Sequence, residues 1–201
     1  MFLNKRVLNL VFIFIIVIYF FQHFRVSRNY SQTYTFGDEN AHMAGGYFVL
    51  KGYKPYKDFS GNHQPLTYIF PAAIQRAIPA NSLYLFVGRH RLAVYLYSIF
   101  WQSVYLFTFG KFIFFFTLIF EITRYVLLGN KVLGETWAMY PLVFLLGIAI
   151  KKAIFNKNLK NHEIILFSLA SFVSAFSLLP VWPSVIVLNA LLLIKHLREK
   201  Q

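Results

Sequence analysis

Seven apolar runs constrain this chain more than any other feature of its sequence. They cover residues 7–21, 65–87, 92–109, 112–128, 137–150, 164–179 and 181–194. Several of them approach or reach the roughly 17–25 residues that a helix needs to cross a hydrocarbon core. Hydrophobic residues make up 58% of the chain and charged residues only 13%, whereas a soluble domain carries about 25% charged residues. The sequence therefore predicts an all-α polytopic membrane protein.

The net charge of +13 is consistent with this class, because the basic residues fall mostly between the apolar runs. There they orient a membrane protein, and no nucleic-acid partner is expected. The first run follows Lys5 and Arg6 and lacks a small-residue cleavage site after it. It is therefore predicted to be a retained anchor with a cytoplasmic amino terminus. The chain has no cysteine, which excludes thiolate metal sites and leaves only imidazole or carboxylate ligands for a divalent cation.

The distribution of basic residues also predicts the number of crossings. If all seven runs cross, most basic residues lie outside, which the positive-inside rule disfavours. We therefore expect residues 112–128 to turn back or to lie along the interface, without a net crossing. Glu135 is then on the same outer side as Asp38, and Arg89 and Arg91 lie at the cytoplasmic boundary.

The predicted organisation has three parts: a first transmembrane helix (1–24), an extracytoplasmic loop with the candidate active site (25–64) and a helix bundle (65–201). The loop is expected to be partly helical. Asp38 can cap a helix with Glu39 in its first turn, and such a helix places Asp38 and His42 on one face. The pair Gly45-Gly46 allows a close approach by another backbone or a ligand, or it simply breaks the helix.

A second group of polar residues precedes the next apolar run. Asp58 opens a polar turn, which its carboxylate is expected to fix through hydrogen bonds to nearby backbone. His63 and Gln64 precede Pro65, which suits a first helical turn. The free N–H groups and positive dipole end of that helix are predicted to form a place for a phosphate.

The order of these features resembles the amino-terminal part of membrane-embedded GT-C glycosyltransferases. The resemblance rests on an anchor helix, Asp-Glu at the start of an outer loop, and then the segments "GGYFVLKGYKPYKDF", "NHQPLTYIFPA" and "GRHRLAVYL". The closest group is family 39-like, related to the aminoarabinose lipid A transferases and protein O-mannosyltransferases. The similarity is concentrated in residues 1–92. Such enzymes generally continue through more transmembrane helices, so this chain is expected to be a truncated portion or a partner-dependent subunit.

This resemblance implies a sugar transfer at the outer face of the plasma or inner membrane. The donor would be a polyprenyl-phosphate sugar, the acceptor a hydroxyl of a lipid, glycan or protein, and the transfer inverting. Asp38 matches the proposed general base of that family, and Glu39 would tune it or bind a cation or the acceptor. His63 with Gln64 would bind the donor phosphate. A second acidic or acceptor site would draw on the remaining candidates, which are Glu135, His42 and Asp58.

Three other classes of protein remain open. The first is a noncatalytic scaffold or lipid-binding subunit with the same amino-terminal architecture. The second is a small transporter, for which only Arg76, Glu121 and Arg124 come near to intramembrane ionisable residues. The third is an outer-face metallohydrolase using Asp38, Glu39 and His42, although the sequence has no HExxH-like signature.

Overall fold

A computed structural model describes residues 5–30, 37–111, 117, 119–121, 123 and 131–198. Every regular element in this part of the chain is a helix, which confirms the all-α class. The elements are α1 (Lys5–Tyr30), α2 (Gly37–Leu50), α3 (Leu66–Ala77), α4 (Leu83–Phe109), α6 (Gly134–Ala153), α7 (Asn161–Ser177), the 3-10 helix η1 (Leu179–Val181) and α8 (Trp182–Arg198).

Among the described residues, three helices are long and apolar enough to cross a membrane. They are α4, α6 and the Asn9–Val26 part of α1. The Leu179–Lys195 segment is a shorter apolar helix. α1 continues to Tyr30, beyond the expected boundary at residue 24, because no glycine or proline interrupts residues 5–30.

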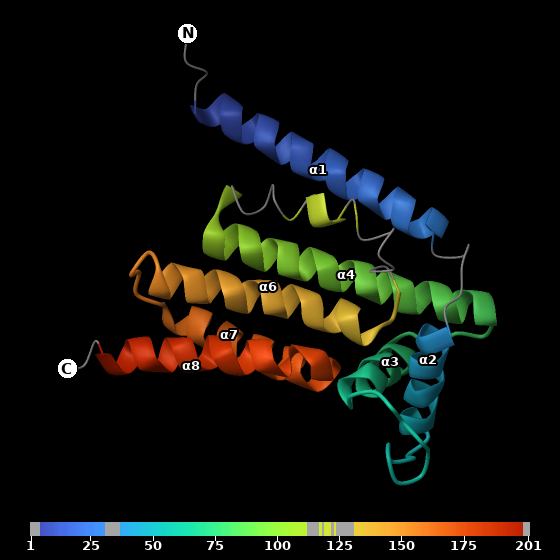
Figure 1. Ribbon diagram of the computed structural model, residues 1–201. Coiled ribbons are helices and arrows are strands. Elements are labelled where there is room, and N and C mark those ends of the chain that lie inside the picture. Colours follow the sequence, from blue (N-terminus) through green and yellow to red (C-terminus); the bar gives the residue numbers. More distant parts are fainter. Residues whose placement is uncertain are drawn as a thin grey trace.

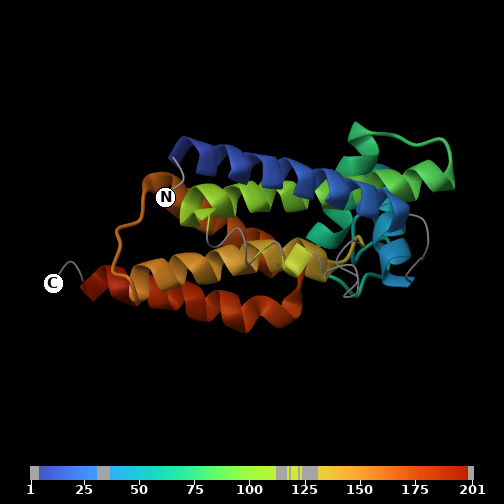
Figure 2. The ribbon, with the colours of Figure 1, turned by 90° about the horizontal axis from the view of Figure 1, so that it is seen from above.

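The long helices lie alongside one another, and α2 and α3 are gathered at one end of them (Figure 1). We call this the α2–α3 end. The start of α1 and the end of α8 lie at the opposite end, which we call the terminal end (Figures 1 and 2). The long helices α4 and α6 both begin at the α2–α3 end (Figure 1).

The hydrophobic core centres on α6, whose buried side chains include Phe144 and Ile148. α6 also contains Pro141, which has no N–H and leaves the carbonyl of Trp137 without its helical donor. The Tyr97 hydroxyl on α4 donates to that carbonyl at 2.7 Å. The proline is therefore accommodated inside the bundle by a side chain of the neighbouring helix.

The expected span over residues 65–87 is wrong, because it is divided between two helices. α3 ends at Ala77 and α4 begins at Leu83. Pro79 lies between them and cannot supply an N–H to continue α3. The Ser82 side chain then accepts from the Leu85 N–H at 3.3 Å and caps the start of α4. As a result, α3 is a separate short helix beside α2 and does not form the first part of a span (Figure 1).

The expected position of Arg89 and Arg91 on the side opposite Asp38 is wrong. Both lie inside α4, near its beginning, and therefore at the same end of the bundle as Asp38. The physical reason is an ion pair, since the buried Arg91 binds the buried carboxylate of Glu39 on α2.

The run over residues 112–128 falls largely outside the described residues, but the positions of its flanks are clear. Lys111 Nζ donates to Asn9 Oδ1 at 2.7 Å, near the start of α1. The Val132 N–H donates to Glu39 Oε1 at 3.2 Å, near the start of α2. The expected absence of a net crossing falls on a run that lies largely outside the described residues. Glu135, in the first turn of α6, lies at the same end as Asp38, as predicted.

Candidate functional site

Glu39 joins three separate parts of the chain at the α2–α3 end. Its carboxylate accepts from Arg91 Nε at 2.9 Å and from Arg91 Nη2 at 2.6 Å, which is a bidentate pair. It also accepts from the Val132 N–H. Both charged side chains are buried, with Glu39 0% and Arg91 2% exposed. Such a pair holds α2 against the start of α4 and against the residues that precede α6.

Asp38 differs from its neighbour in being exposed. It lies inside the first turn of α2, which begins at Gly37, so it does not take the capping position that the sequence indicated. A carboxylate in a first helical turn is stabilised by the helix dipole. Glu39 is enclosed by its donors, and Asp38 is the carboxylate of the pair that an incoming molecule can reach.

His42 lies one turn after Asp38 and is 1% exposed. Its Nδ1 is 2.8 Å from the Val132 carbonyl, which can only accept, so Nδ1 carries the hydrogen. Its Nε2 is buried and has no hydrogen-bond partner in the part of the chain that the structure describes. Burial lowers the pKa of His42 below its usual value, more than the Val132 carbonyl raises it. The ring is therefore neutral near pH 7, with Nε2 available as an acceptor.

Three further predicted residues surround His42. Its ring meets the ring of His63 edge-on, with centroids 4.3 Å apart. His63 further lowers the pKa of His42, whereas Asp38 and Glu135 raise it through their charges. Asp38, His42, His63 and Glu135 therefore form one group, which we call the His42 cluster.

The glycine pair in α2 brings α3 into this position. A Cβ on Gly45 would lie 2.3 Å from Tyr68 Cδ1, and a Cβ on Gly46 would lie 2.6 Å from Pro71 Cβ. α2 runs unbroken from Gly37 to Leu50. The close approach of another segment is thus the correct interpretation of Gly45-Gly46, and it places His63, just before α3, beside His42.

The predicted phosphate site at the start of α3 differs from expectation. The Thr67 N–H donates to the Gln64 carbonyl, and the Tyr68 and Ile69 N–H groups both donate to the Pro65 carbonyl. The expectation of free N–H groups is therefore wrong for these three residues. The Thr67 hydroxyl also donates to the Gln64 carbonyl, at 2.5 Å, so the Gln64 backbone serves to begin the helix.

Asp58 lies outside the His42 cluster. Its Oδ2 accepts from the Lys54 N–H at 2.8 Å within the turn, the kind of local backbone contact that the sequence predicted. This bond agrees with the expected role of Asp58 in fixing the turn. No contact in the described part of the chain joins Asp58 to the His42 cluster in support of its alternative role as an acidic site residue.

Lys131 is a residue that the sequence did not single out. It is 2% exposed, and burial lowers its pKa to about 8, with a further contribution from the charge of Arg91. The sequence did contain a signal for the pairing of Arg91 with Glu39, because an acidic residue buried in an apolar bundle needs a cationic partner. No comparable pattern in the sequence indicated Lys131.

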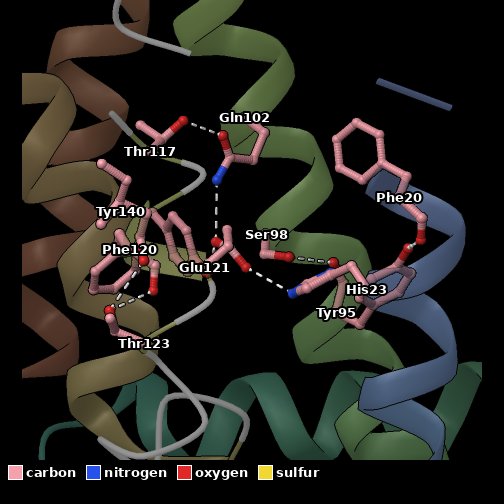
Figure 3. A network of polar contacts seen from close by, with 11 residues as sticks. Phe20, His23, Tyr95, Ser98, Gln102, Thr117, Phe120, Glu121, Thr123 and Tyr140 are labelled. Carbon is pink, nitrogen blue, oxygen red and sulfur yellow. Dashed lines mark hydrogen bonds and ion pairs between the residues drawn. The ribbon is translucent and has the colours of Figure 1, made fainter. Parts of the chain in front are cut away.

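A second buried polar group lies between α1, α4 and α6 (Figure 3). His23 Nε2 is 3.0 Å from Glu121 Oε2, and Gln102 Nε2 donates to Glu121 Oε1 at 3.1 Å. The Tyr140 hydroxyl also donates to Glu121, and the Thr117 hydroxyl donates to Gln102. This group shares no residue with the His42 cluster, and it ties the described residues between 117 and 123 to three long helices.

No metal centre is assembled by the described residues, in which no group of three His, Cys, Asp or Glu side chains is placed to hold an ion. The described residues form two pockets that are relevant to a ligand. One of about 230 Å³ lies between α2, α3 and α4. The other, of about 320 Å³, lies between α6 and α8. Asp38 lines neither of them.

Comparisons with the known protein families, with curated proteins and with solved structures find no match for this chain. The structure itself defines the class. In its described residues the chain is all-helical, with three helices able, by length and composition, to cross a membrane, and with charged and imidazole side chains gathered at one end.

Proposed function

We propose that this chain is a membrane glycosyltransferase of the GT-C type, or the portion of one that carries the base. The observation that supports it best is the junction of Glu39 with Arg91 and Val132, because it anchors α2 while Asp38 beside it stays exposed. In the proposed reaction, the Asp38 carboxylate takes the proton of an acceptor hydroxyl. The acceptor oxygen then bonds to the anomeric carbon of the sugar. The bond from that carbon to the phosphate oxygen breaks, the polyprenyl phosphate leaves with the electron pair, and the configuration inverts.

The other members of the His42 cluster take supporting roles in this proposal. His42, whose ring is buried, positions the cluster through its contacts with the Val132 carbonyl and the ring of His63. His63, with the side chain of Gln64, binds the donor phosphate, and Glu135 is the second acidic group. Glu39 acts through Arg91 as a positioning residue, because its carboxylate is enclosed by its donors.

The orientation in the membrane is also part of the proposal. We propose a multi-pass protein of the plasma or inner membrane with a cytoplasmic amino terminus and the α2–α3 end outside. Its support is the resemblance of residues 1–92 to GT-C glycosyltransferases. Basic residues lie at both ends of the bundle, Arg89 and Arg91 among them, and only those at the terminal end agree with the positive-inside rule. These are Lys151, Lys152, Lys157 and Lys160, together with Lys5 and Arg6 at the start of α1.

The test is transfer from a radiolabelled polyprenyl-phosphate sugar by the purified full chain. Asp38→Asn is expected to lower the rate by about 10²-fold or more, the range for loss of a general base, with an unchanged unfolding temperature. The matched control is Asp58→Asn, which removes an exposed carboxylate outside the His42 cluster and should keep the wild-type rate. Wild-type turnover by Asp38→Asn would remove Asp38 from the mechanism.

A noncatalytic lipid-binding or scaffold subunit is the second candidate function. It is favoured by the pocket between α6 and α8, whose lining is apolar apart from Ser184 and includes Leu142, Leu146 and Val187. Such a surface suits a lipid chain. Donor binding without turnover, under conditions in which a longer GT-C enzyme is active, would support this candidate over the first.

A further inference from the structure

The pocket between α2, α3 and α4 has polar groups suited to a ligand, and their role is independent of the proposed transfer reaction. Its walls are Tyr47 from α2, Gln75 from α3 and Phe86, Arg89 and His90 from α4. Tyr47 follows Asp38 by nine residues, which is about 13.5 Å along an α-helix. The pocket is therefore separate from the exposed carboxylate and from the His42 cluster.

Arg89 gives this pocket its charge. It is partly exposed and makes one hydrogen bond in the described part of the chain, from Nη1 to the Ile78 carbonyl at 3.3 Å. A guanidinium has five N–H donors, so most of them remain available. No acidic side chain lines the pocket. An anion with oxygen acceptors, such as a phosphate, matches this arrangement.

Gln75 supplies a hydrogen-bond acceptor, whereas Arg89 supplies donors. Its Nε2 donates to the Met43 carbonyl at 2.8 Å and lies 3.2 Å from His90 Nε2. His90 Nδ1 is 2.7 Å from the Phe86 carbonyl, so it carries the hydrogen, and Nε2 is an acceptor for the Gln75 amide. Both amide hydrogens of Gln75 are thus engaged.

The Gln75 carbonyl oxygen is left buried and without a hydrogen-bond donor among the described residues. Gln75 as a whole is only 6% exposed. A buried acceptor of this kind costs about 1–3 kcal/mol when it stays unpaired. A hydroxyl group on a molecule in the pocket can supply the missing donor.

The surroundings and size of the pocket indicate how such a molecule would approach. It opens beside the first turns of α4, one of the helices that can cross a membrane, and the exposed apolar side chains of Leu50 and Ile78 line it. Its volume of about 230 Å³ is below the roughly 300–1,000 Å³ of pockets that enclose a whole drug-sized ligand. It therefore suits a headgroup whose apolar part remains outside.

We propose that this pocket binds a phosphate that carries hydroxyl groups, with Arg89 on the phosphate and the Gln75 carbonyl on a hydroxyl. This chemistry is shared by the headgroup of a hydroxylated anionic phospholipid and by a soluble polyol phosphate. The two sources are distinguished by competition, as described below.

The test is a binding titration of the purified full chain in an uncharged detergent, with bound lipid counted by native mass spectrometry. Dioleoyl phosphatidylglycerol is expected to bind at least tenfold more tightly than dioleoyl phosphatidylcholine. Arg89→Gln should weaken phosphatidylglycerol binding by tenfold or more. The matched control is Arg76→Gln, which removes an exposed charge from the last turn of α3 without changing the pocket lining, and it should leave the binding unchanged. Equal loss in both variants, or no loss in Arg89→Gln, would overturn the site.

Two further ligands test the hydroxyl contact and the source of the phosphate. Dioleoyl phosphatidylethanol has the same charge as phosphatidylglycerol but no headgroup hydroxyl, so weaker binding is expected, and equal binding would overturn the role of the Gln75 carbonyl. Displacement of phosphatidylglycerol by glycerol 3-phosphate would support the site with a soluble phosphate as its ligand. Lipid binding that glycerol 3-phosphate does not displace would support it with a membrane headgroup as its ligand. Because none of these measurements involves sugar transfer, their failure is distinguishable from failure of the proposed function.

Discussion

The buried charges of Glu39 and Arg91 at the α2–α3 end are stable because each is the partner of the other. Glu39 is fully enclosed and receives two bonds from Arg91 and one from the Val132 backbone. Removing one member of such a pair costs more than the pair contributes, since the other charge is left buried alone. Asp38, one residue away, has no such constraint and is exposed. Two adjacent carboxylates thus have different roles because of their surroundings.

Arg91→Gln is therefore expected to lower the free energy of unfolding by about 3–5 kcal/mol, the range for a broken buried ion pair. The measurement is denaturant unfolding of the purified protein in one detergent. Arg76→Gln, which removes an exposed arginine, should change the stability little. The double variant Glu39→Gln with Arg91→Gln should be less destabilised than the sum of its single variants, because no charge is then left unpaired. An additive double variant would contradict the pairing.

His42 is expected to make stability depend on pH. Its pKa in the folded protein is below 6.5 because of burial, so the unfolded chain binds more protons between the two pKa values. Its contribution to stability is thus present above pH 6.5 and is lost as the pH falls through the folded pKa. The unfolding temperature at pH 7.5 and at pH 5.5 should differ less in His42→Gln than in the wild type. His162→Gln, at an exposed position, should retain the wild-type difference, and an identical slope in both variants would argue against this role of His42.

At the scale of the elements, α2 and α3 form a tightly packed pair because α2 presents a surface without side chains. Gly45 faces the ring of Tyr68, and Gly46 faces Pro71 and the backbone of Ala72. Glycine lowers the stability of an isolated helix, and in α2 this cost is offset by the close contact. The contact brings His63 to His42.

A methyl group at Gly46 is expected to separate these two helices. Its Cβ would lie 2.6 Å from Pro71 Cβ and 2.8 Å from the Ala72 nitrogen, and backbone cannot move aside as a flexible side chain can. Gly46→Ala should therefore destabilise the protein by about 1–3 kcal/mol, as overpacking does. Gly88→Ala is the matched control, because Gly88 lies in α4 with no atom near its missing Cβ, and it should stabilise by about 0.5–1 kcal/mol. Equal unfolding midpoints for the two variants would contradict the close contact.

At the scale of the whole molecule, contacts at the two ends of the bundle determine the path of the chain. Lys111 lies beside Asn9 at the terminal end, and Val132 lies beside Glu39 at the α2–α3 end. The α2–α3 end holds the whole His42 cluster. If the three long apolar helices cross a membrane, this cluster is on one side of it and the residues between α6 and α7 are on the other.

Labelling of single cysteines would test this path directly, because the chain has no native cysteine. Cysteines at Lys57 and Glu135 should react with a membrane-impermeant thiol reagent from one side, and cysteines at Lys111 and Lys157 from the other. All four positions are exposed. Right-side-out and inverted vesicles provide the two sides. Reaction of position 111 together with position 57 would instead support the arrangement expected from the distribution of basic residues.

The features that the sequence predicted correctly are local ones. Hydropathy predicted the all-helical class. Helical periodicity placed Asp38 and His42 on one face of a helix, and the turn chemistry of Asp58 predicted a backbone contact now seen with Lys54. Each of these depends on residues within about one turn of each other, so the pattern in the chain contains the information.

What the sequence by itself determined, then, is the helical class, the apolar spans of α1 and α6, and the helix that carries Asp38. Only the tertiary structure decided that Arg91 is the partner of Glu39 and that Gly45-Gly46 receives α3. The physical reason is distance along the chain. Glu39 and Arg91 are 52 residues apart, and a basic residue near an apolar run has the same local pattern whether it orients a helix or neutralises a buried carboxylate.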